Sequence, residues 1–266
     1  FNEMFKSYNS FILLAVPFFL LTANLMNVGG ITDRMLKRAR TMVGHFPGGL
    51  AQINVLLSVF FAGISGSSTA DAASQGKLFI EAQVKEGYDL SFSIAITAVS
   101  AVLAVIIPPS ILMVVWGGVI STSIGAMYLA GIVPGLLIGI AQMATVHAYA
   151  KRRNYPRAAR WPNAKEFWSD MWPAFPALAA PVLLTVGMLV GFFTPTEIAS
   201  VTVAYTVFIG IFYYKKLTLS GLTAAAFETI RATAGILLIV SIAALFGWIL
   251  SVEQISQQIT AGMLSI

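Results

Sequence analysis

Long runs without a charged side chain dominate the sequence. They cover residues 7–32, 41–70, 90–150, 171–196, 198–214 and 232–252. Each run is close to or above the ~17–25 residues with which a helix crosses a bilayer, and the third is long enough for two crossings. The pattern predicts an all-α polytopic membrane protein in which residues 1–266 form a single transmembrane domain.

The composition supports this prediction. Hydrophobic residues make up 58% of the 266 positions and charged residues 10%, whereas soluble domains carry about 25% charged residues. The chain has no cysteine, which excludes disulfides and thiol catalysis. It opens on Phe1 without a signal-peptide pattern, so we expect a fragment with sequence missing before this residue.

Basic residues gather in three segments between the apolar runs, at 29–48, 151–172 and 215–216. The positive-inside rule places all three in the cytoplasm. A single crossing by residues 49–87 would put the second segment, with six basic and two acidic residues, on the outside. We therefore predict a re-entrant hairpin over about 46–87 that opens to the cytoplasm, and a cytoplasmic loop over 151–173.

The tip of the predicted hairpin is the stretch "GISGSST", which contains Gly63, Gly66 and Ser68. The first arm, residues 50–61, would be about 18 Å long as a helix, enough to reach the middle of the membrane. The returning arm carries Lys77 and Glu81 one helical turn apart. A non-helical tip at that depth is tolerated only beside protein or a water-filled cavity, so we expect it to face a site.

A second break is predicted in the helix over 91–117, at Pro108 and Pro109. The two prolines remove the N–H groups that would bond the carbonyls of Ala104 and Val105. A kinked helix is the simpler interpretation, and a discontinuous helix is the one that two adjacent prolines favour. A broken helix opposite a hairpin tip is typical of ion and substrate sites in secondary transporters.

The hydroxyls at the tip suit a hard cation such as Na⁺, which prefers oxygen ligands. Ser65 and Ser67 supply two hydroxyls, and the glycines allow backbone carbonyls to turn inward. Ser68 and Asp71 match a capping box at the start of the returning arm. An intramembrane carboxylate is also a functional candidate, and the two roles of Asp71 are compatible.

Residues 23–36 and 247–260 share a pattern of helix end, polar turn and Ile-Thr-x-x-Met or Ile-Ser-x-x-Ile. Their predicted orientations in the membrane are opposite, which indicates inverted repeats. We expect a first repeat over 1–150 and the start of a second over 174–266, whose hairpin would lie beyond Ile266. Residues 215–231 are predicted to form a separate helix along the cytoplasmic interface.

A few other polar residues receive structural roles. Glu197, two residues after Pro195, is expected to stabilise a helix N-terminus. Asn24 and Gln52 are candidates for hydrogen bonds between helices.

Three motifs in this order, "GISGSSTADAA", "IIPPSILMVVWGGVISTSIGAMYLAGIVPGLL" and "GFFTPTEIASVTVAYT", resemble the large membrane subunit of tripartite ATP-independent periplasmic (TRAP) transporters. The resemblance implies an elevator-type permease of the bacterial inner membrane. It implies Na⁺ symport of an organic acid such as a C4-dicarboxylate or sialic acid. A periplasmic binding protein would deliver the substrate, and a small four-helix membrane subunit would be the partner.

The resemblance also assigns roles to single residues. It assigns Na⁺ ligation to two hydroxyls and to carbonyls of the broken helix, namely Ser65, Ser67, Ala104, Ile107 and Pro109. It assigns substrate contact to Ser67, Asp71 and Ser123.

Two rival functions remain open. A binding-protein-independent Na⁺/dicarboxylate symporter has a similar hairpin architecture. An intramembrane hydrolase using Ser65 or Ser67 would need a general base in reach, and His45 and His147 both lie at membrane edges. We therefore expect a transporter and no enzyme. ATP-driven transport has no P-loop to support it.

Overall fold

The computed structural model describes residues 11–120, 122–157, 172 and 175–264, and its regular structure within these ranges is entirely helical. The helices, in chain order, are η1 (Phe11–Leu14), α2 (Ala15–Val28), α3 (Ile31–Val43), α4 (Gly49–Ser65), α5 (Ser68–Gln75), the π-helix η2 (Gly76–Ile80), α6 (Glu81–Lys85), α7 (Leu90–Ala101), α8 (Leu103–Ile106), α9 (Ile111–Ile120), α10 (Ile124–Arg153), α12 (Phe175–Leu189), α13 (Pro195–Phe208), the π-helix η4 (Ile209–Tyr213), α14 (Leu219–Val252) and α15 (Ile255–Leu264).

Four helices of the described chain are long and apolar enough to cross a membrane. They are Phe11–Val28, Ile124–Arg153, Pro195–Tyr213 and Leu219–Val252. Leu90–Ile106 and Ile111–Ile120 together pass the same test as one span that is bent by 42°. The prediction of an all-α polytopic membrane protein with a discontinuous helix is thereby confirmed.

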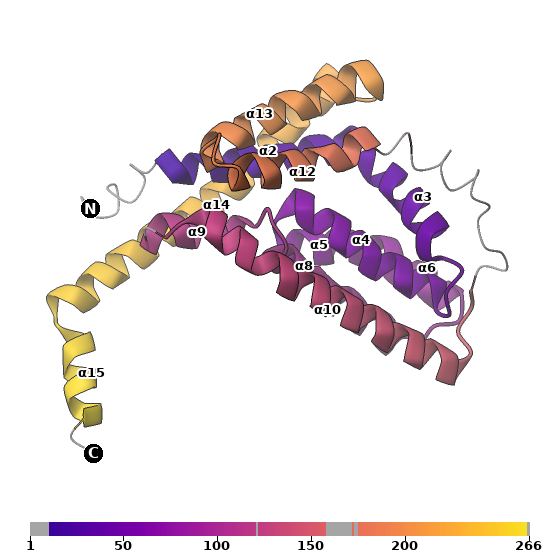
Figure 1. Cartoon of the computed structure of the whole chain (residues 1–266), viewed down its shortest axis with the longest axis horizontal. Helices are drawn as coiled ribbons and strands as arrows, with labels where there is room; N and C mark the ends of the chain where they lie inside the picture. The colour runs from indigo at the N-terminus through magenta and orange to yellow at the C-terminus, as the bar shows by residue number, and fades with distance from the viewer. Residues whose placement is uncertain (1–10, 121, 158–171, 173–174, 265–266) are drawn as a thin grey trace.

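The helices form two groups that lie side by side (Figure 1). In one group α2 packs against α13 and α14, and α12 packs against α13. In the other group α4 packs against α7, α8 and α10. Side-chain amides join helices, as expected. Asn24 Nδ2 donates to Thr229 Oγ1 of α14 at 3.0 Å, and Gln52 Nε2 donates to the Met143 carbonyl of α10 at 3.0 Å.

Helix α4 and the returning arm α5–η2–α6 form a helical hairpin over the residues predicted to be re-entrant, and its two ends meet at one base. The Gly49 N–H and the Tyr88 hydroxyl both donate to the Pro156 carbonyl, at 3.2 and 3.3 Å. Burial raises the pKa of Tyr88 to about 12, so its hydroxyl stays protonated and serves as a donor. An ion pair between Asp89 and Arg153 ties the same base to the end of α10.

The three basic segments lie on the same side as this base. A Cβ atom at Gly30 would lie 2.8 Å from the Lys216 side chain, so the first segment touches the third. A Cβ atom at Gly48 would lie 2.8 Å from Ala150, next to the second segment. The base of the helical hairpin therefore lies on the same side of the protein as the basic segments. That the hairpin re-enters the membrane from the cytoplasm stays a prediction. The rest of the second segment, residues 158–171, lies outside the described residues.

Several expected lengths and pairings are wrong in detail. Helix α4 has 17 residues, five more than the predicted arm. Glu81 pairs with Lys85 at 2.6 Å, not with Lys77, which lies in the π-helix η2 where the regular α-helical register is lost. Helix α12 has 15 residues, about 22 Å at ~1.5 Å per residue, and is too short for a full crossing.

The interfacial helix expected over 215–231 is not a separate element. Its residues from Leu219 onward are continuous with the following span in the 34-residue helix α14. No proline interrupts α14, and its three glycines, Gly221, Gly235 and Gly247, all lie in regular helix. The local causes that usually kink a helix are therefore not expressed here.

The two segments proposed as repeats have the same local backbone. Gly30 precedes α3 with φ +66°, and Gln254 precedes α15 with φ +51°, so each residue adopts the left-handed conformation. The helices that follow begin at Ile31 and Ile255. Both pairs of positions differ by 224 residues (254 − 30 and 255 − 31), which is the offset of the sequence match.

Candidate functional site

The chain reverses direction at the hairpin tip within two residues. Gly66 ends α4 with φ +58°, a left-handed conformation that glycine adopts readily. Ser67 is extended and becomes the N-cap of α5, where its hydroxyl accepts from the Ala70 N–H at 3.4 Å. The Ser67 hydroxyl also lies 3.2 Å from the Thr69 hydroxyl. A sharp, polar turn thus sits between two helix ends.

The predicted capping box of Ser68 and Asp71 is wrong by one residue. Because Gly66 absorbs the reversal, Ser67 takes the cap and Ala70 takes the position that would complete the box. Asp71 lies one position further and is only 1% exposed. Its carboxylate accepts a hydrogen bond from the Ser65 hydroxyl, and the Ser67 N–H in turn donates to Ser65 Oγ at 3.3 Å. Ser65 and Asp71 therefore belong to one buried polar group inside the tip.

The hairpin tip lies directly against the break between α8 and α9. The Ile111 N–H donates to the Gly66 carbonyl at 3.2 Å. A Cβ atom at Gly66 would lie 2.8 Å from the Pro109 carbonyl oxygen and 2.9 Å from the Ile111 nitrogen. Gly63 lies against Pro181 of α12, where a Cβ atom would be 2.7 Å from the proline Cβ. The expectation that the two breaks face each other is confirmed.

The carbonyls near the two prolines have different surroundings. Val105, one of the two expected to be free, accepts from the Ser110 hydroxyl at 3.0 Å. Ala104 is fully buried in a small cluster with Ala62 of α4. The Ile107 side chain packs where a Cβ atom of Gly135 in α10 would lie. Of the three carbonyls assigned to Na⁺, the structure brings that of Pro109 directly to the tip.

A cavity of 320 Å³ adjoins the tip and separates it from α14. Its polar wall is formed by Ser67 and Ser68, and its apolar walls come from the broken helix and from α14, with the side chains Val105, Ile111, Leu112, Val115, Ile236, Ile239 and Val240. The tip thus faces an open hollow lined by protein side chains, which agrees with the physical cost of placing an irregular backbone in lipid. The hydroxyls are available at its edge for a polar or ionic ligand.

Ser123 lies away from this group. It is the exposed N-cap of α10, where its hydroxyl accepts from the Ala126 N–H at 3.3 Å. The ten residues of α9 separate it from the break, a distance of about 15 Å along the helix. The structure therefore brings Ser65, Ser67, Asp71 and Pro109 together and leaves Ser123 at the opposite end of α9.

Sequence reasoning missed a set of buried polar residues behind the tip. Asn54 and Ser58 on α4 face Gln75 of the returning arm and Thr97 of α7. The available signal was the spacing of four residues between polar positions in apolar helices, which repeats at Asp71 and Gln75.

One family of known proteins matches the chain over its full length. The family described as "Tripartite ATP-independent periplasmic transporter, DctM component" matches residues 1–266. The sialic acid TRAP transporter large permease protein SiaM of Vibrio cholerae is 40% identical over 268 residues, which cover all of this chain and 62% of the relative. The sialic acid TRAP transporter permease protein SiaT of Haemophilus influenzae is 39% identical over 97% of this chain and 42% of its own length.

A third relative has a different substrate in its name. The C4-dicarboxylate TRAP transporter large permease protein DctM of Pseudomonas aeruginosa is 36% identical over 97% of this chain and 60% of its own length. The chain thus spans between 42% and 62% of the lengths of these three relatives.

Proposed function

Since the chain belongs to the DctM family of tripartite ATP-independent periplasmic (TRAP) transporters, we propose that it serves the uptake of an organic acid driven by Na⁺. Family membership and the apolar helices make it a multi-pass protein of the bacterial inner membrane. The family is one of transporters, so the intramembrane hydrolase has no support from it. We propose C4-dicarboxylates and sialic acids as the substrate class, because relatives that carry these names match the chain over nearly its whole length.

The contact between the hairpin tip and the broken helix carries this proposal. Two interruptions of helical structure meet there, joined by the hydrogen bond from the Ile111 N–H to the Gly66 carbonyl. Helix ends inside a membrane leave carbonyls and N–H groups for a ligand, and midplane sites of secondary transporters are built in this way. The hydroxyls of Ser65 and Ser67 and the Pro109 carbonyl would bind Na⁺ at this contact. Ala104 and Ile107 would act through carbonyls further along the same break.

Substrate would enter the cavity beside the tip. Ser67 lines this cavity, whereas Asp71 is buried behind it and would act on the substrate only through Ser65 and the backbone of the tip. A role for Ser123 in the same cavity would require the far end of α9 to approach the tip. We propose that this occurs through the relative movement of the two helix groups, as in an elevator mechanism, with the repeats in inverted orientation.

A small four-helix membrane subunit and a periplasmic binding protein are the proposed partners. The test uses the full reading frame, reconstituted with its small subunit in proteoliposomes. Uptake of radiolabelled succinate and sialic acid is followed with an inward Na⁺ gradient, with and without the binding protein. We expect uptake that needs both. Uptake with the gradient alone would favour the binding-protein-independent symporter, and uptake without any dependence on Na⁺ would refute the coupling.

A pair of serine variants tests the ion site. Removal of a hydroxyl ligand weakens cation binding, so we expect Ser65→Ala to raise the Na⁺ concentration for half-maximal uptake about tenfold, equivalent to ~1.4 kcal/mol of binding free energy. Ser251→Ala is the matched control, because its exposed hydroxyl bonds only the Gly247 carbonyl within α14. Equal Na⁺ dependence in the two variants would remove Ser65 from the proposed site.

A further inference from the structure

Buried polar side chains continue from the tip down the inside of the hairpin, where α4, the returning arm and α7 meet. We call this set the hairpin seam. Each member is at most 7% exposed, and the members are Asn54, Ser58, Ser65, Asp71, Gln75, Gln83, Ser93, Thr97 and Ser100. A span that is held together by apolar packing needs few such residues, and polar residues inside membranes usually mark functional positions.

Hydrogen bonds cross the seam at three depths. Nearest the tip, Ser65 bonds Asp71. Further down α4, the Ser58 hydroxyl lies 2.8 Å from Gln75 Oε1, and then Asn54 Nδ2 donates to Thr97 Oγ1 at 2.7 Å. The eleven residues from Asn54 to Ser65 correspond to about 16 Å of helix. The seam therefore runs from the tip most of the way down α4 toward the base of the hairpin.

These hydrogen bonds leave several polar atoms of the seam without a hydrogen-bond partner in the described part of the chain. Asn54 Oδ1, Asp71 Oδ2, Gln75 Nε2 and both amide atoms of Gln83 are buried and have no partner among the residues that the structure describes. A seam that served only to hold the two arms together would pair these atoms with each other. Buried polar atoms of native proteins that lack a protein partner are satisfied by water or by an ion.

The atoms left over are mainly oxygens. Ser58 has one hydroxyl proton, yet both the Asn54 carbonyl, at 3.1 Å, and Gln75 Oε1 are in reach of it as acceptors. The conflict disappears if the Gln75 amide is turned over, so that its nitrogen donates to Ser58 and its oxygen becomes free. Asn54, Gln75 and Asp71 then offer one free oxygen each at successive depths. Such oxygens are the ligands of hard cations.

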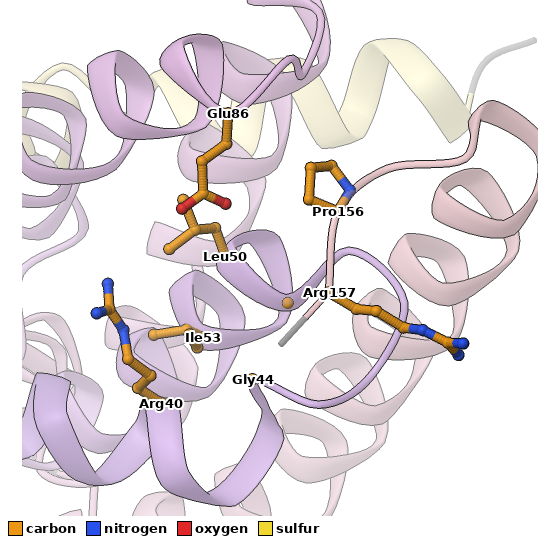
Figure 2. A pocket seen from close by; sticks show the side chains of 8 residues that line it. Arg40, Gly44, Leu50, Ile53, Glu86, Pro156 and Arg157 are labelled. Atoms are coloured by element: carbon orange, nitrogen blue, oxygen red, sulfur yellow. The ribbon is translucent and has the colours of Figure 1, made fainter. Parts of the chain in front are cut away.

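A second cavity lies at the base of the hairpin, at the α4 residues that precede Asn54. This cavity of 360 Å³ is lined by Arg40, Gly44, Gly49, Leu50, Ile53, Glu86, Pro156 and Arg157. Ile53 directly precedes Asn54 on α4. Figure 2 shows the Glu86 side chain extending toward Leu50, whereas the Arg157 side chain points away from it. The cavity carries both positive charge, from Arg40 and Arg157, and negative charge, from Glu86. It would therefore not select cations by itself, and selection would begin at the oxygens of the seam.

We propose that the hairpin seam is a water-lined path for a small monovalent cation, which connects the tip to the cavity at the cytoplasmic base. The inference deepens the proposed function and rests on it in one respect, since the cation that uses the path would be the Na⁺ released from the tip. The path itself requires only that water and a cation of this size reach Ser58 from the cytoplasm.

The 266 residues contain no cysteine, so a single thiol introduced on the seam can report whether a cation reaches it. The probe is Ag⁺, a monovalent cation similar in size to Na⁺ that bonds a thiol sulfur and displaces its proton. Ser58→Cys is placed in the full reading frame after any cysteine outside residues 1–266, or in the small subunit, has been replaced by serine. The complex is studied in inside-out vesicles in nitrate salts. Thiols that remain are counted with a fluorescent maleimide after denaturation. Leu57→Cys is the matched control, because Leu57 is equally buried but belongs to the apolar core.

We expect Ag⁺ to react with Ser58→Cys at least tenfold faster than with Leu57→Cys, and Na⁺ to slow only the first reaction. Asn54→Leu, added to Ser58→Cys, should slow it to the rate of the control. Equal rates for Ser58→Cys and Leu57→Cys would overturn the proposal.

A second pair, on α7 and α8, tests the proposal independently in case Ser58→Cys misfolds. Thr97→Cys, on the seam, is compared with Leu103→Cys, whose side chain is fully buried in the small apolar cluster with Ala62. Equal rates there would overturn the proposal in the same way. If both seam variants react fast but the protein shows no Na⁺-driven uptake, the path is supported and Na⁺ coupling is refuted. Failure of the path and failure of the proposed function therefore give different results.

Discussion

At the scale of single residues, the tip depends on which residue ends the first arm. Gly66 turns the backbone through the left-handed conformation, and Ser67 is therefore the cap of the returning arm. This shift of one residue takes Asp71 away from the cap and into the interior, beside Ser65. A glycine with free space would tolerate a side chain, but this one touches the Pro109 carbonyl.

Gly66→Ala is expected to separate the tip from the broken helix. The new Cβ atom would lie 2.8 Å from the Pro109 oxygen and would occupy an unfavourable φ, so we expect a loss of about 1–3 kcal/mol in the free energy of unfolding. Uptake should fall about tenfold, the factor that corresponds to ~1.4 kcal/mol. Thermal unfolding in detergent and proteoliposome uptake measure the two effects.

Gly76→Ala provides the control for this change. Its Cβ atom would meet only Ile80 Cδ1, at 3.6 Å, and its backbone is helical. We expect unchanged uptake, because alanine is the better helix former at such a position. If both variants lose uptake to the same extent, the contact of Gly66 with Pro109 is not the cause.

At the scale of elements, α13 begins with a complete capping box. Thr194 caps the helix, Pro195 occupies its first position, and Glu197 reaches back to the Thr194 N–H at 2.8 Å. The Thr194 hydroxyl in turn accepts from the Glu197 N–H at 3.3 Å. The role expected for Glu197 is confirmed. The cap matters for packing because α13 lies against both α2 and α12.

Glu197→Ala should destabilise the protein modestly. Loss of a capping box costs ~1 kcal/mol, which lowers the melting temperature of a protein of this size by about 2–4 °C. Glu228→Ala removes an exposed glutamate from the middle of α14 and should leave the melting temperature unchanged. A melting curve for Glu197→Ala that coincides with that of Glu228→Ala would show that the cap has no energetic weight.

At the scale of the whole molecule, the orientation in the membrane can be tested at the two ends of α10. Ser123 caps its first turn and Asn154, with φ +53°, ends its last turn beside three basic residues. Both positions are exposed. Because a helix of 30 residues, about 45 Å, crosses the membrane once, its two caps lie on opposite sides.

Single cysteines at these caps should react from opposite sides. We expect a membrane-impermeant maleimide to label Ser123→Cys in right-side-out vesicles and Asn154→Cys in inside-out vesicles, because the positive-inside rule places Asn154 in the cytoplasm. The reverse pattern would turn the whole topology over and put the hairpin base on the outer side.

The sequence alone predicted the features that depend on composition along the chain. Four of the six apolar runs supply most of the residues of the helices that are long enough to span, and the pair Pro108 and Pro109 indicated the break. The three basic segments lie on the side of the hairpin base. These features follow from the cost of placing charge and unpaired backbone groups in lipid, which each segment incurs whatever its neighbours are. The N-terminal cap of α13 could also be predicted from the sequence, because the residues that form it all lie within four positions.

What only the tertiary structure decided concerns residues distant in the chain. The structure placed Ser123 at the far end of α9 from the tip. It also brought Ser58 to Gln75 and Asn54 to Thr97, and so assembled the hairpin seam. Helical periodicity places a polar residue on a face, but the partner of that face depends on how three helices pack together, and no local pattern in the sequence contains that information.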